Sequence, residues 1–259
     1  MEMIKTQGLV LRKYNYSENS LLVTFFTETL GKIKTLVKGA KKPKGRFFGK
    51  LELCAVVELM VNARPRTDLH LLTDAALIET FDALRTDIEK FAHAMVILEI
   101  VESAFEVESP NASFYQDLRR GFGMFAAGPM DLWLPTLMHL KLLHALGLLP
   151  SEDSCQECGK LLGGPFVFSF QRGASLCKEC SPRRTGEIAG ESWQILYLKS
   201  VADSSLAHCS SLAISEAQKR RFFAWTRNCL DGVVHKRIRS YDFLSRVGSL
   251  PFVRGGQVG

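Results

Sequence analysis

The first 81 residues alternate between apolar and polar positions with a period of two, which is typical of β-strands. The pattern predicts five strands, at residues 4–14, 21–27, 32–38, 51–61 and 69–75. Gly8 interrupts the first strand and predicts a bulge or bend there. The connections between the strands are short, so neighbouring strands should be antiparallel. Together these features predict a small closed barrel.

The pattern changes at residue 86 to the three- and four-residue spacing of amphipathic helices. Three pairs of residues fit a capping box at the start of a helix: Thr86 with Glu89, Ser113 with Gln116, and Ser215 with Gln218. A further helix is expected from Asp131 to Gly147. The apolar segment 132–149 contains His139 and Lys141, so it predicts a buried helix rather than a membrane span.

Four of the seven cysteines form two close pairs, Cys155 with Cys158 and Cys177 with Cys180, separated by eighteen residues. This spacing predicts one zinc ion bound by four thiolates, and two disulfides are the alternative. A β-hairpin is expected between the pairs, which would make the segment a zinc ribbon. Four thiolates leave no position open for water, so the zinc is expected to be structural rather than catalytic.

Positive charge is concentrated at the start of the chain. The net charge of the whole chain is +6, but residues 1–50 contain eleven Lys and Arg and only three acidic residues. That segment therefore carries +8, which leaves −2 for the rest of the chain. Such an asymmetry predicts a surface that binds a polyanion.

Seven residues are expected to bind DNA: Lys32, Lys34, Lys38, Lys41, Lys42, Lys44 and Arg46. The strand alternation places Lys32, Lys34 and Lys38 together on one face of the third strand. The segment 38–46 contains five of the seven basic residues and two glycines. Glycines let the backbone approach phosphates, and lysines supply the charge. Of Phe47 and Phe48, which follow, at least one is expected in the core, and either could stack on a base.

The chain lacks the motifs of a phosphate-loop ATPase, a zinc deaminase or a serine hydrolase, and no enzyme activity is expected. Segment 121–126 matches a loose dinucleotide-binding pattern, but no strand precedes it. A magnesium-dependent nuclease would need carboxylates from different elements to meet at one site. Candidates are Glu52 with Glu58 and Glu99 with Glu102, but no sequence pattern pairs either set with carboxylates of another element. An RNA-binding or ribosome-associated factor remains an alternative, because barrels and zinc ribbons of this kind also occur there.

In their order along the chain, these features resemble the RecO family of bacterial DNA repair and recombination-mediator proteins. The resemblance covers about residues 3–245. Its matching segments are GLVL at 8–11, YSENS at 16–20, KGAKKPKGRF at 38–47, LKLLHALGLLP at 140–150, the two cysteine pairs, and RSYDFL at 239–244.

The resemblance implies an α+β multidomain protein. An OB-fold barrel is expected at residues 1–81, consistent with the five predicted strands. A helical domain is expected at 82–150 and 187–245, with a four-cysteine zinc ribbon inserted at 151–186. Residues 246–259 are expected to form a flexible tail.

The resemblance also implies a function and partners. RecO-like proteins bind single- and double-stranded DNA, anneal complementary strands and hydrolyse no nucleotide. They associate with RecR and with the C-terminal tail of single-stranded DNA-binding protein, and they help to load RecA. A cytoplasmic location without membrane contact is expected. The pocket for that tail is expected near Arg119 or Arg120. Near the C-terminus, Lys236, Arg237 and Arg239 are either a DNA contact or a solvated helix end.

Overall fold

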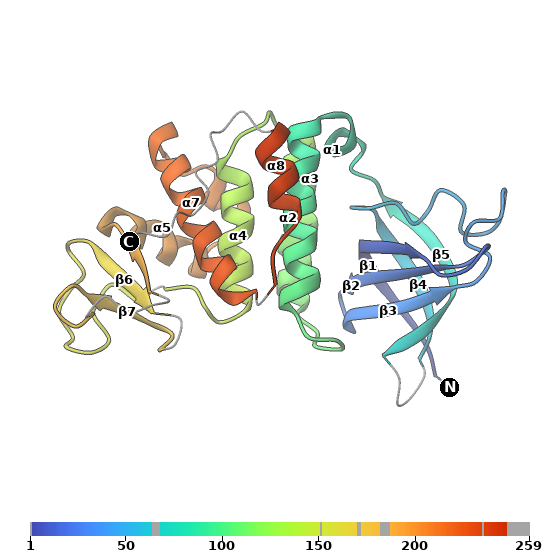
Figure 1. Cartoon of the computed structure of the whole chain (residues 1–259), viewed down its shortest axis with the longest axis horizontal. Helices are drawn as coiled ribbons and strands as arrows, with labels where there is room; N and C mark the ends of the chain where they lie inside the picture. The colour runs from blue at the N-terminus through green and yellow to red at the C-terminus, as the bar shows by residue number, and fades with distance from the viewer. Residues whose placement is uncertain are drawn as a thin grey trace.

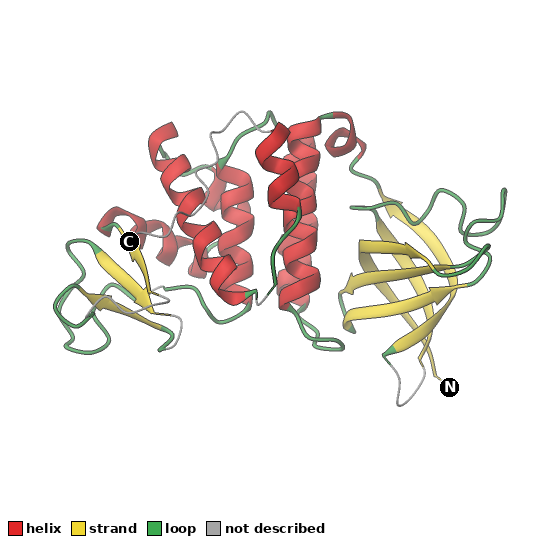
Figure 2. Ribbon diagram, viewed as in Figure 1, coloured by secondary structure: helices red, strands yellow, loops and turns green. Residues whose placement is uncertain are grey.

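The computed structural model describes residues 2–63, 68–150, 152–169, 172–181, 187–234 and 236–247. A β-barrel lies at one end of the molecule, a group of helices in the middle, and a small three-stranded sheet at the other end (Figures 1 and 2). The predicted α+β architecture, with a four-cysteine module between two helical segments, is confirmed. Of the predicted tail, residues 248–259 lie outside the described residues.

Five strands form the closed barrel: β1 (Glu2–Asn15), β2 (Leu21–Thr27), β3 (Gly31–Val37), β4 (Val56–Ala63) and β5 (Leu69–Glu79). The order around the barrel is β1-β2-β3-β5-β4, and β3 with β5 is a parallel pair. The interior is packed by alternate residues of the strands, among them Phe25, Ile33 and Leu59. The predicted five-stranded barrel is confirmed.

Two details of the predicted strands are wrong. The register shift in β1 falls between Val10 and Arg12 rather than at Gly8. A Cβ at Gly8 would lie 3.0 Å from a side-chain atom of Leu59, so close packing explains this glycine. The fourth strand begins at residue 56 instead of 51, because Cys54 has a φ of 66° and breaks the extended backbone.

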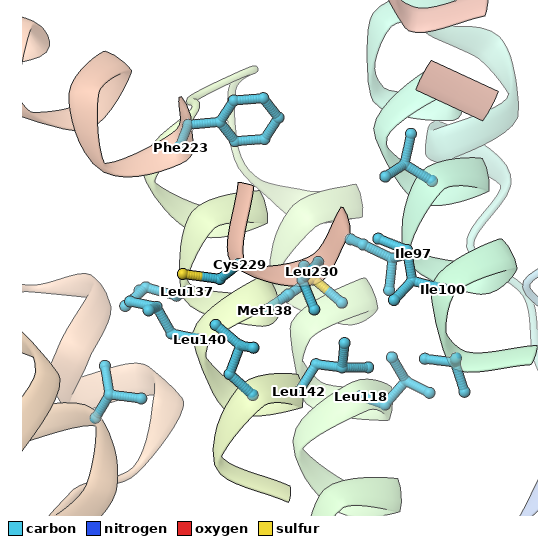
Figure 3. Packing of buried hydrophobic residues seen from close by; sticks show 14 of the residues in the cluster. Ile97, Ile100, Leu118, Leu137, Met138, Leu140, Leu142, Phe223, Cys229 and Leu230 are labelled. Atoms are coloured by element: carbon cyan, nitrogen blue, oxygen red, sulfur yellow. The ribbon is translucent and has the colours of Figure 1, made fainter. Parts of the chain in front are cut away.

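The helical region contains eight helices among the described residues: α1 (Asp82–Thr86), α2 (Ile88–Ala104), α3 (Ala112–Ala127), α4 (Trp133–Ala145), α5 (Ser192–Asp203), α6 (Leu206–Ser210), α7 (Glu216–Val233) and α8 (Ser240–Val247). Figure 3 shows side chains of α2, α3, α4 and α7 meeting in one cluster, with Leu137 and Leu140 of α4 beside Cys229 of α7. Helix α4 is buried along most of its length, which accounts for its apolar sequence. Among the described residues, no helix is long and apolar enough to cross a membrane.

Two of the three predicted capping boxes are displaced. Helix α2 is capped by Asp87, whose carboxylate accepts hydrogen bonds from two backbone N–H groups in the first turn. Helix α3 is capped by Asn111 rather than Ser113. Asp and Asn cap a helix as effectively as Ser. The match of Thr86 and Ser113 to the capping-box motif therefore did not determine where these two helices begin. The capping box of Ser215 and Gln218 is confirmed.

The barrel, the helices and the small sheet share one hydrophobic cluster. At the barrel, Phe26 of β2 packs against Phe105 and Phe114, with ring centroids 4.8 and 5.6 Å away. At the small sheet, Phe166 packs against Trp225 of α7, with centroids 6.4 Å apart. The helices therefore cover the outer face of the barrel around Phe26.

Candidate nucleic-acid interface and metal centre

The basic loop, residues 38–50 between β3 and β4, is anchored on the barrel at several points. Phe47 is buried in the barrel core, as expected for one of the two phenylalanines, whereas Phe48 is 64% exposed. The Arg46 guanidinium donates to the Thr73 carbonyl at 2.6 Å, and the Lys50 ammonium donates to the Ala75 carbonyl at 2.8 Å. These contacts hold the loop in a defined position although its surface is polar.

The basic loop also contacts the connection between β1 and β2. The backbone N–H of Lys41 donates to the Asn19 carbonyl at 3.4 Å, and its ammonium donates to the Ser17 carbonyl at 3.1 Å. Figure 1 shows both connections at the end of the barrel that is remote from the helices. This end therefore combines two neighbouring segments in one surface.

Five of the seven residues predicted to bind DNA are exposed: Lys34, Lys38, Lys42, Lys44 and Arg46. Lys41 is half-buried through its contacts with the β1–β2 connection. Within the described part of the chain, none of these six side chains forms an ion pair with a carboxylate. Their charge is not neutralised locally, so it can act on a polyanion in solution.

Lys32 lies on the same face of β3 as Lys34, as predicted, but the helices bury it, so its expected availability to DNA is wrong. It is 8% exposed, and its ammonium donates to the Glu102 carbonyl of α2 at 2.6 Å. Burial lowers the pKa of Lys32, while the nearby Glu102 carboxylate acts in the opposite direction. The alternation along β3 is as predicted, but the helices cover the part of the face where Lys32 lies.

The basic residues near the C-terminus are engaged with acidic residues. The ammonium of Lys236 lies 3.1 Å from the Glu102 carboxylate, and the guanidinium of Arg237 lies 2.8 Å from Asp242. The backbone N–H of Arg239 donates to Glu99 at 3.0 Å. The contacts with Glu99 and Glu102 connect the segment leading into α8 to α2, and the ion pairs of Lys236 and Arg237 leave this cluster with less free charge than the basic loop.

The side chains of Arg119 and Arg120 have different surroundings. The Arg119 guanidinium lies 2.8 Å from the Glu79 carboxylate of β5 and 3.1 Å from the side-chain oxygen of Gln7. It therefore connects α3 to the barrel. Arg120 is exposed. The predicted pocket for a protein tail near these residues stays a prediction.

The four cysteines of the two predicted pairs converge. The Sγ atoms of Cys155, Cys158, Cys177 and Cys180 all lie within 4.8 Å of one another, and those of Cys158 and Cys177 are 3.8 Å apart. Four sulfurs arranged tetrahedrally about 2.3 Å from one zinc ion would be separated by roughly 3.8 Å. Within the described residues, no other group of His, Cys, Asp and Glu side chains has a geometry that could hold a metal ion.

The backbone and the neighbouring thiols shift the pKa values of these cysteines in opposite directions. Burial acts to raise the pKa of Cys155, but backbone N–H groups directed at its sulfur outweigh burial and lower the pKa to about 6. The neighbouring thiols of Cys158 and Cys177 raise the pKa of Cys180 to about 12. Four thiolates so close together repel one another, and a bound divalent cation removes that repulsion.

The expected hairpin between the cysteine pairs is present as β6 (Phe166–Ser169) and β7 (Ala174–Cys177). A third strand, β8 (Glu187–Gly190), pairs with the other edge of β6 and was not predicted. Its Gly190 is required by packing, because a Cβ there would lie 2.3 Å from the ring of Phe166. A four-residue strand with one glycine has too weak a pattern to be found from periodicity.

Two comparisons identify the family. The family model described as "Recombination protein O N terminal" matches residues 1–81, and "Recombination protein O C terminal" matches residues 85–242. A protein named DNA repair protein RecO from Anaeromyxobacter sp. (strain K) is 28% identical over 96% of this chain and 99% of its own length. A protein of the same name from Exiguobacterium sp. (strain ATCC BAA-1283 / AT1b) is 32% identical over 76% of this chain and 78% of its own length. The two family models together match the barrel, most of the helices and the four-cysteine module, and the chain therefore belongs to the RecO family.

Proposed function

We propose that this protein is a DNA repair and recombination mediator that binds single- and double-stranded DNA and acts without catalysing a reaction. In this proposal it anneals complementary strands coated with single-stranded DNA-binding protein and, with RecR, helps to load RecA in the cytoplasm. The names of the relatives support a role in DNA repair. The observation that carries the binding step is the group of cations on the basic loop, which form no ion pair among the described residues and lie at the end of the barrel remote from the helices.

The basic loop suits a phosphate backbone for two reasons. The side chains of Lys38, Lys42 and Lys44 are exposed and form no ion pair among the described residues, so they can approach phosphates without losing an internal carboxylate partner. Its backbone is anchored by Phe47 and Arg46, so little ordering is needed when DNA binds. Each phosphate that is neutralised on a single strand contributes about −0.7 to the slope of log affinity against log salt concentration.

The experiment is annealing of two complementary labelled oligonucleotides that are already coated with single-stranded DNA-binding protein, with no ATP present. We expect the protein to accelerate annealing. The variant Lys42→Glu/Lys44→Glu should lose most of this acceleration, and its salt slope on a single strand should be smaller by about 1.4. No acceleration by folded protein, combined with tighter binding to structured RNA than to DNA, would favour an RNA-binding factor instead.

The variant Arg220→Glu/Arg246→Glu is the matched control. Both arginines are exposed, and the double substitution changes the net charge by the same amount. A general electrostatic effect would weaken DNA binding equally in both double variants. If the loop itself binds DNA, the control variant should keep the affinity and salt slope of the wild-type protein.

We also propose that the four cysteines bind one structural zinc ion. The sulfur-only ligand set and the closeness of the four sulfur atoms support zinc over magnesium or calcium, which prefer oxygen ligands. A full set of four thiolates supports a structural role. When bound, the ion would supply the positive charge that holds together the turn with Cys155 and Cys158 and the turn with Cys177 and Cys180. We call these the two cysteine turns.

A further inference from the structure

The outer face of β1, β2 and β3 carries a row of apolar and aromatic side chains beside the basic loop. Tyr14 is directly opposite Leu22 on β2, and Leu22 is directly opposite Leu36 on β3. Residues paired in this way lie on the same face of a sheet, with Cβ atoms about 4.5–5.5 Å apart. The adjacent Val23 points into the barrel core, so the row Tyr14–Leu22–Leu36 lies on the outside. We call these three residues the outer row.

The outer row is accessible to a ligand. Tyr14 is 46% exposed, and Leu22 and Leu36 are half-buried. Along β2 from Leu22 toward the helices, the next outward-facing residue, Thr24, is buried, and the one after it, Phe26, is fully buried. The helices therefore cover one end of this face and leave the end with the outer row open.

Cations border the outer row. The next pairing along the sheet places Arg12, Thr24 and Lys34 side by side, and Lys34 is exposed. The Arg12 guanidinium lies 4.4 Å from the centroid of the Tyr14 ring. This contact limits the motion of the ring. The Arg12 guanidinium also lies 3.5 Å from the Glu102 carboxylate, so the cation on this side that has no ion pair among the described residues is Lys34. Exposed Lys38 follows directly after β3, so charge lies on both sides of the row.

A second exposed tyrosine lies in the β1–β2 connection. Tyr16 is 57% exposed, and its backbone N–H donates to the Ser20 carbonyl at 3.0 Å, which closes the turn. Lys41 of the basic loop binds the Ser17 carbonyl of the same turn. Among the described residues, four large aromatic side chains are exposed, and Tyr14, Tyr16 and Phe48 are three of them. Three of the four exposed aromatic side chains among the described residues thus lie at the end of the barrel that carries the basic loop.

This combination matches a single strand of nucleic acid better than a duplex. A single strand offers unstacked base faces next to its phosphates, whereas a duplex hides the base faces in its stack. Aromatic side chains bind such faces with little regard for sequence, and neighbouring lysines bind the phosphates. On a surface that bound only duplex DNA, aromatic rings between the cations would find no exposed base faces to stack on.

We propose that Tyr14 and Tyr16 stack on bases of a single strand that crosses the outer row, while Lys34 and Lys38 contact its phosphates. This inference rests on the proposed function, because it assumes that the free end of the barrel binds nucleic acid. It adds the mode of binding, and it assigns a preference for single strands to this face.

The test measures affinities by fluorescence anisotropy for three probes of equal length: a thymidine oligonucleotide, the same oligonucleotide with central abasic sites, and a duplex. The wild-type protein should bind the thymidine probe more tightly than the abasic probe, because the two carry the same phosphates. In Tyr14→Leu/Tyr16→Leu, affinity for the thymidine probe should fall on the order of tenfold, and the preference over the abasic probe should disappear. Its salt slope and its affinity for the duplex should not change.

Two control variants separate stacking from folding. Tyr14→Phe/Tyr16→Phe keeps the rings and should bind like the wild-type protein. Phe243→Leu removes an exposed aromatic ring from α8, far from the barrel end, and should have no effect. An unchanged preference for bases over abasic sites in the leucine variant would overturn the stacking inference while the proposed function stands. Failure of the wild-type protein to bind any probe would overturn both.

Discussion

Two histidines in the helical core, His93 on α2 and His139 on α4, are each 1% exposed. Both pack against Phe223, with ring centroids 5.4 Å away. Within the described residues, neither ring nitrogen of His93 has a hydrogen-bond partner, and Nε2 of His139 has none. Burial lowers the pKa of His93 to about 4. Burial, with a smaller effect from His93, lowers the pKa of His139 to about 3. Both rings are therefore neutral in the folded protein at neutral pH.

This burial predicts a specific loss of stability in mild acid. Below pH 6.5 the unfolded chain binds protons at these histidines and the folded chain does not. The free energy of unfolding should therefore fall as pH decreases from 6.5 to 4, by about 1.4 kcal/mol per pH unit for each histidine. Urea unfolding at a series of pH values, followed by tryptophan fluorescence, measures this slope.

The slope is assigned by comparing two variants. In His93→Leu/His139→Leu the dependence on pH should be reduced by the contribution of both histidines. In His144→Leu, which changes an exposed histidine of α4, the dependence should remain. Equal slopes in the wild-type protein and the double variant would show that other groups cause the loss of stability.

At the scale of elements, the three-stranded sheet and the two cysteine turns form a unit with little core of its own. Phe166 and Phe168 are buried, but they belong to the cluster shared with the helices. The segment with Cys155 and Cys158 is joined to the segment with Cys177 and Cys180 by a hydrogen bond from the Gln156 backbone N–H to the Ser175 carbonyl at 3.1 Å. An exposed ion pair between Lys160 and Glu179 at 3.2 Å contributes little. The order of the turns should therefore depend mainly on the bound metal.

Metal removal should accordingly unfold this module and spare the barrel. We expect Cys158→Ser to lose one equivalent of metal and to lose protection from hydrogen exchange across residues 152–169 and 172–181. The barrel amides should keep their protection, because no barrel residue contributes to the cysteine group. Elemental analysis and hydrogen exchange with mass spectrometry measure the two effects.

Cys209→Ser is the control for this prediction, since Cys209 is a buried cysteine outside the group. It should retain the metal even if it lowers stability. Full metal content in Cys158→Ser, or equal loss of protection in the barrel, would contradict the proposed structural role of the ion.

At the scale of the whole molecule, the barrel and the helices meet in a closely fitted junction. Gly31, at the start of β3, has a φ of 68°, and a Cβ there would lie 2.2 Å from the Ser109 carbonyl oxygen. Nearby, the backbone N–H of Glu108 donates to the Lys32 carbonyl at 2.9 Å. The junction therefore combines backbone contact with the buried Lys32 and the aromatic cluster around Phe26.

Gly49 provides a matched control for the junction, because its φ is 70° and a Cβ there would meet no atom within 4 Å. Gly49→Ala should cost about 1–2 kcal/mol from the left-handed backbone alone. Gly31→Ala should cost at least about 1–3 kcal/mol more, because the added methyl group collides with backbone. Urea unfolding compares the two variants. Equal losses would show that the barrel and helices do not approach closely at Ser109.

The sequence by itself determined the elements that depend on local patterns. Strand β2 has the predicted bounds, and the capping box at Ser215 begins α7 as predicted. The four cysteines converge as their spacing indicated. In each case the controlling interactions join residues that are close in the chain or follow one period, so a single segment contains the information.

Only the tertiary structure decided which charged and aromatic side chains remain available. Lys32 and Lys34 lie on the same face of one strand, yet Lys32 is buried by a contact with Glu102, seventy residues away. The outer row depends on the register of three strands, which a bulge in β1 shifts. Burial and register arise from contacts between distant segments, and periodicity within one segment does not encode them.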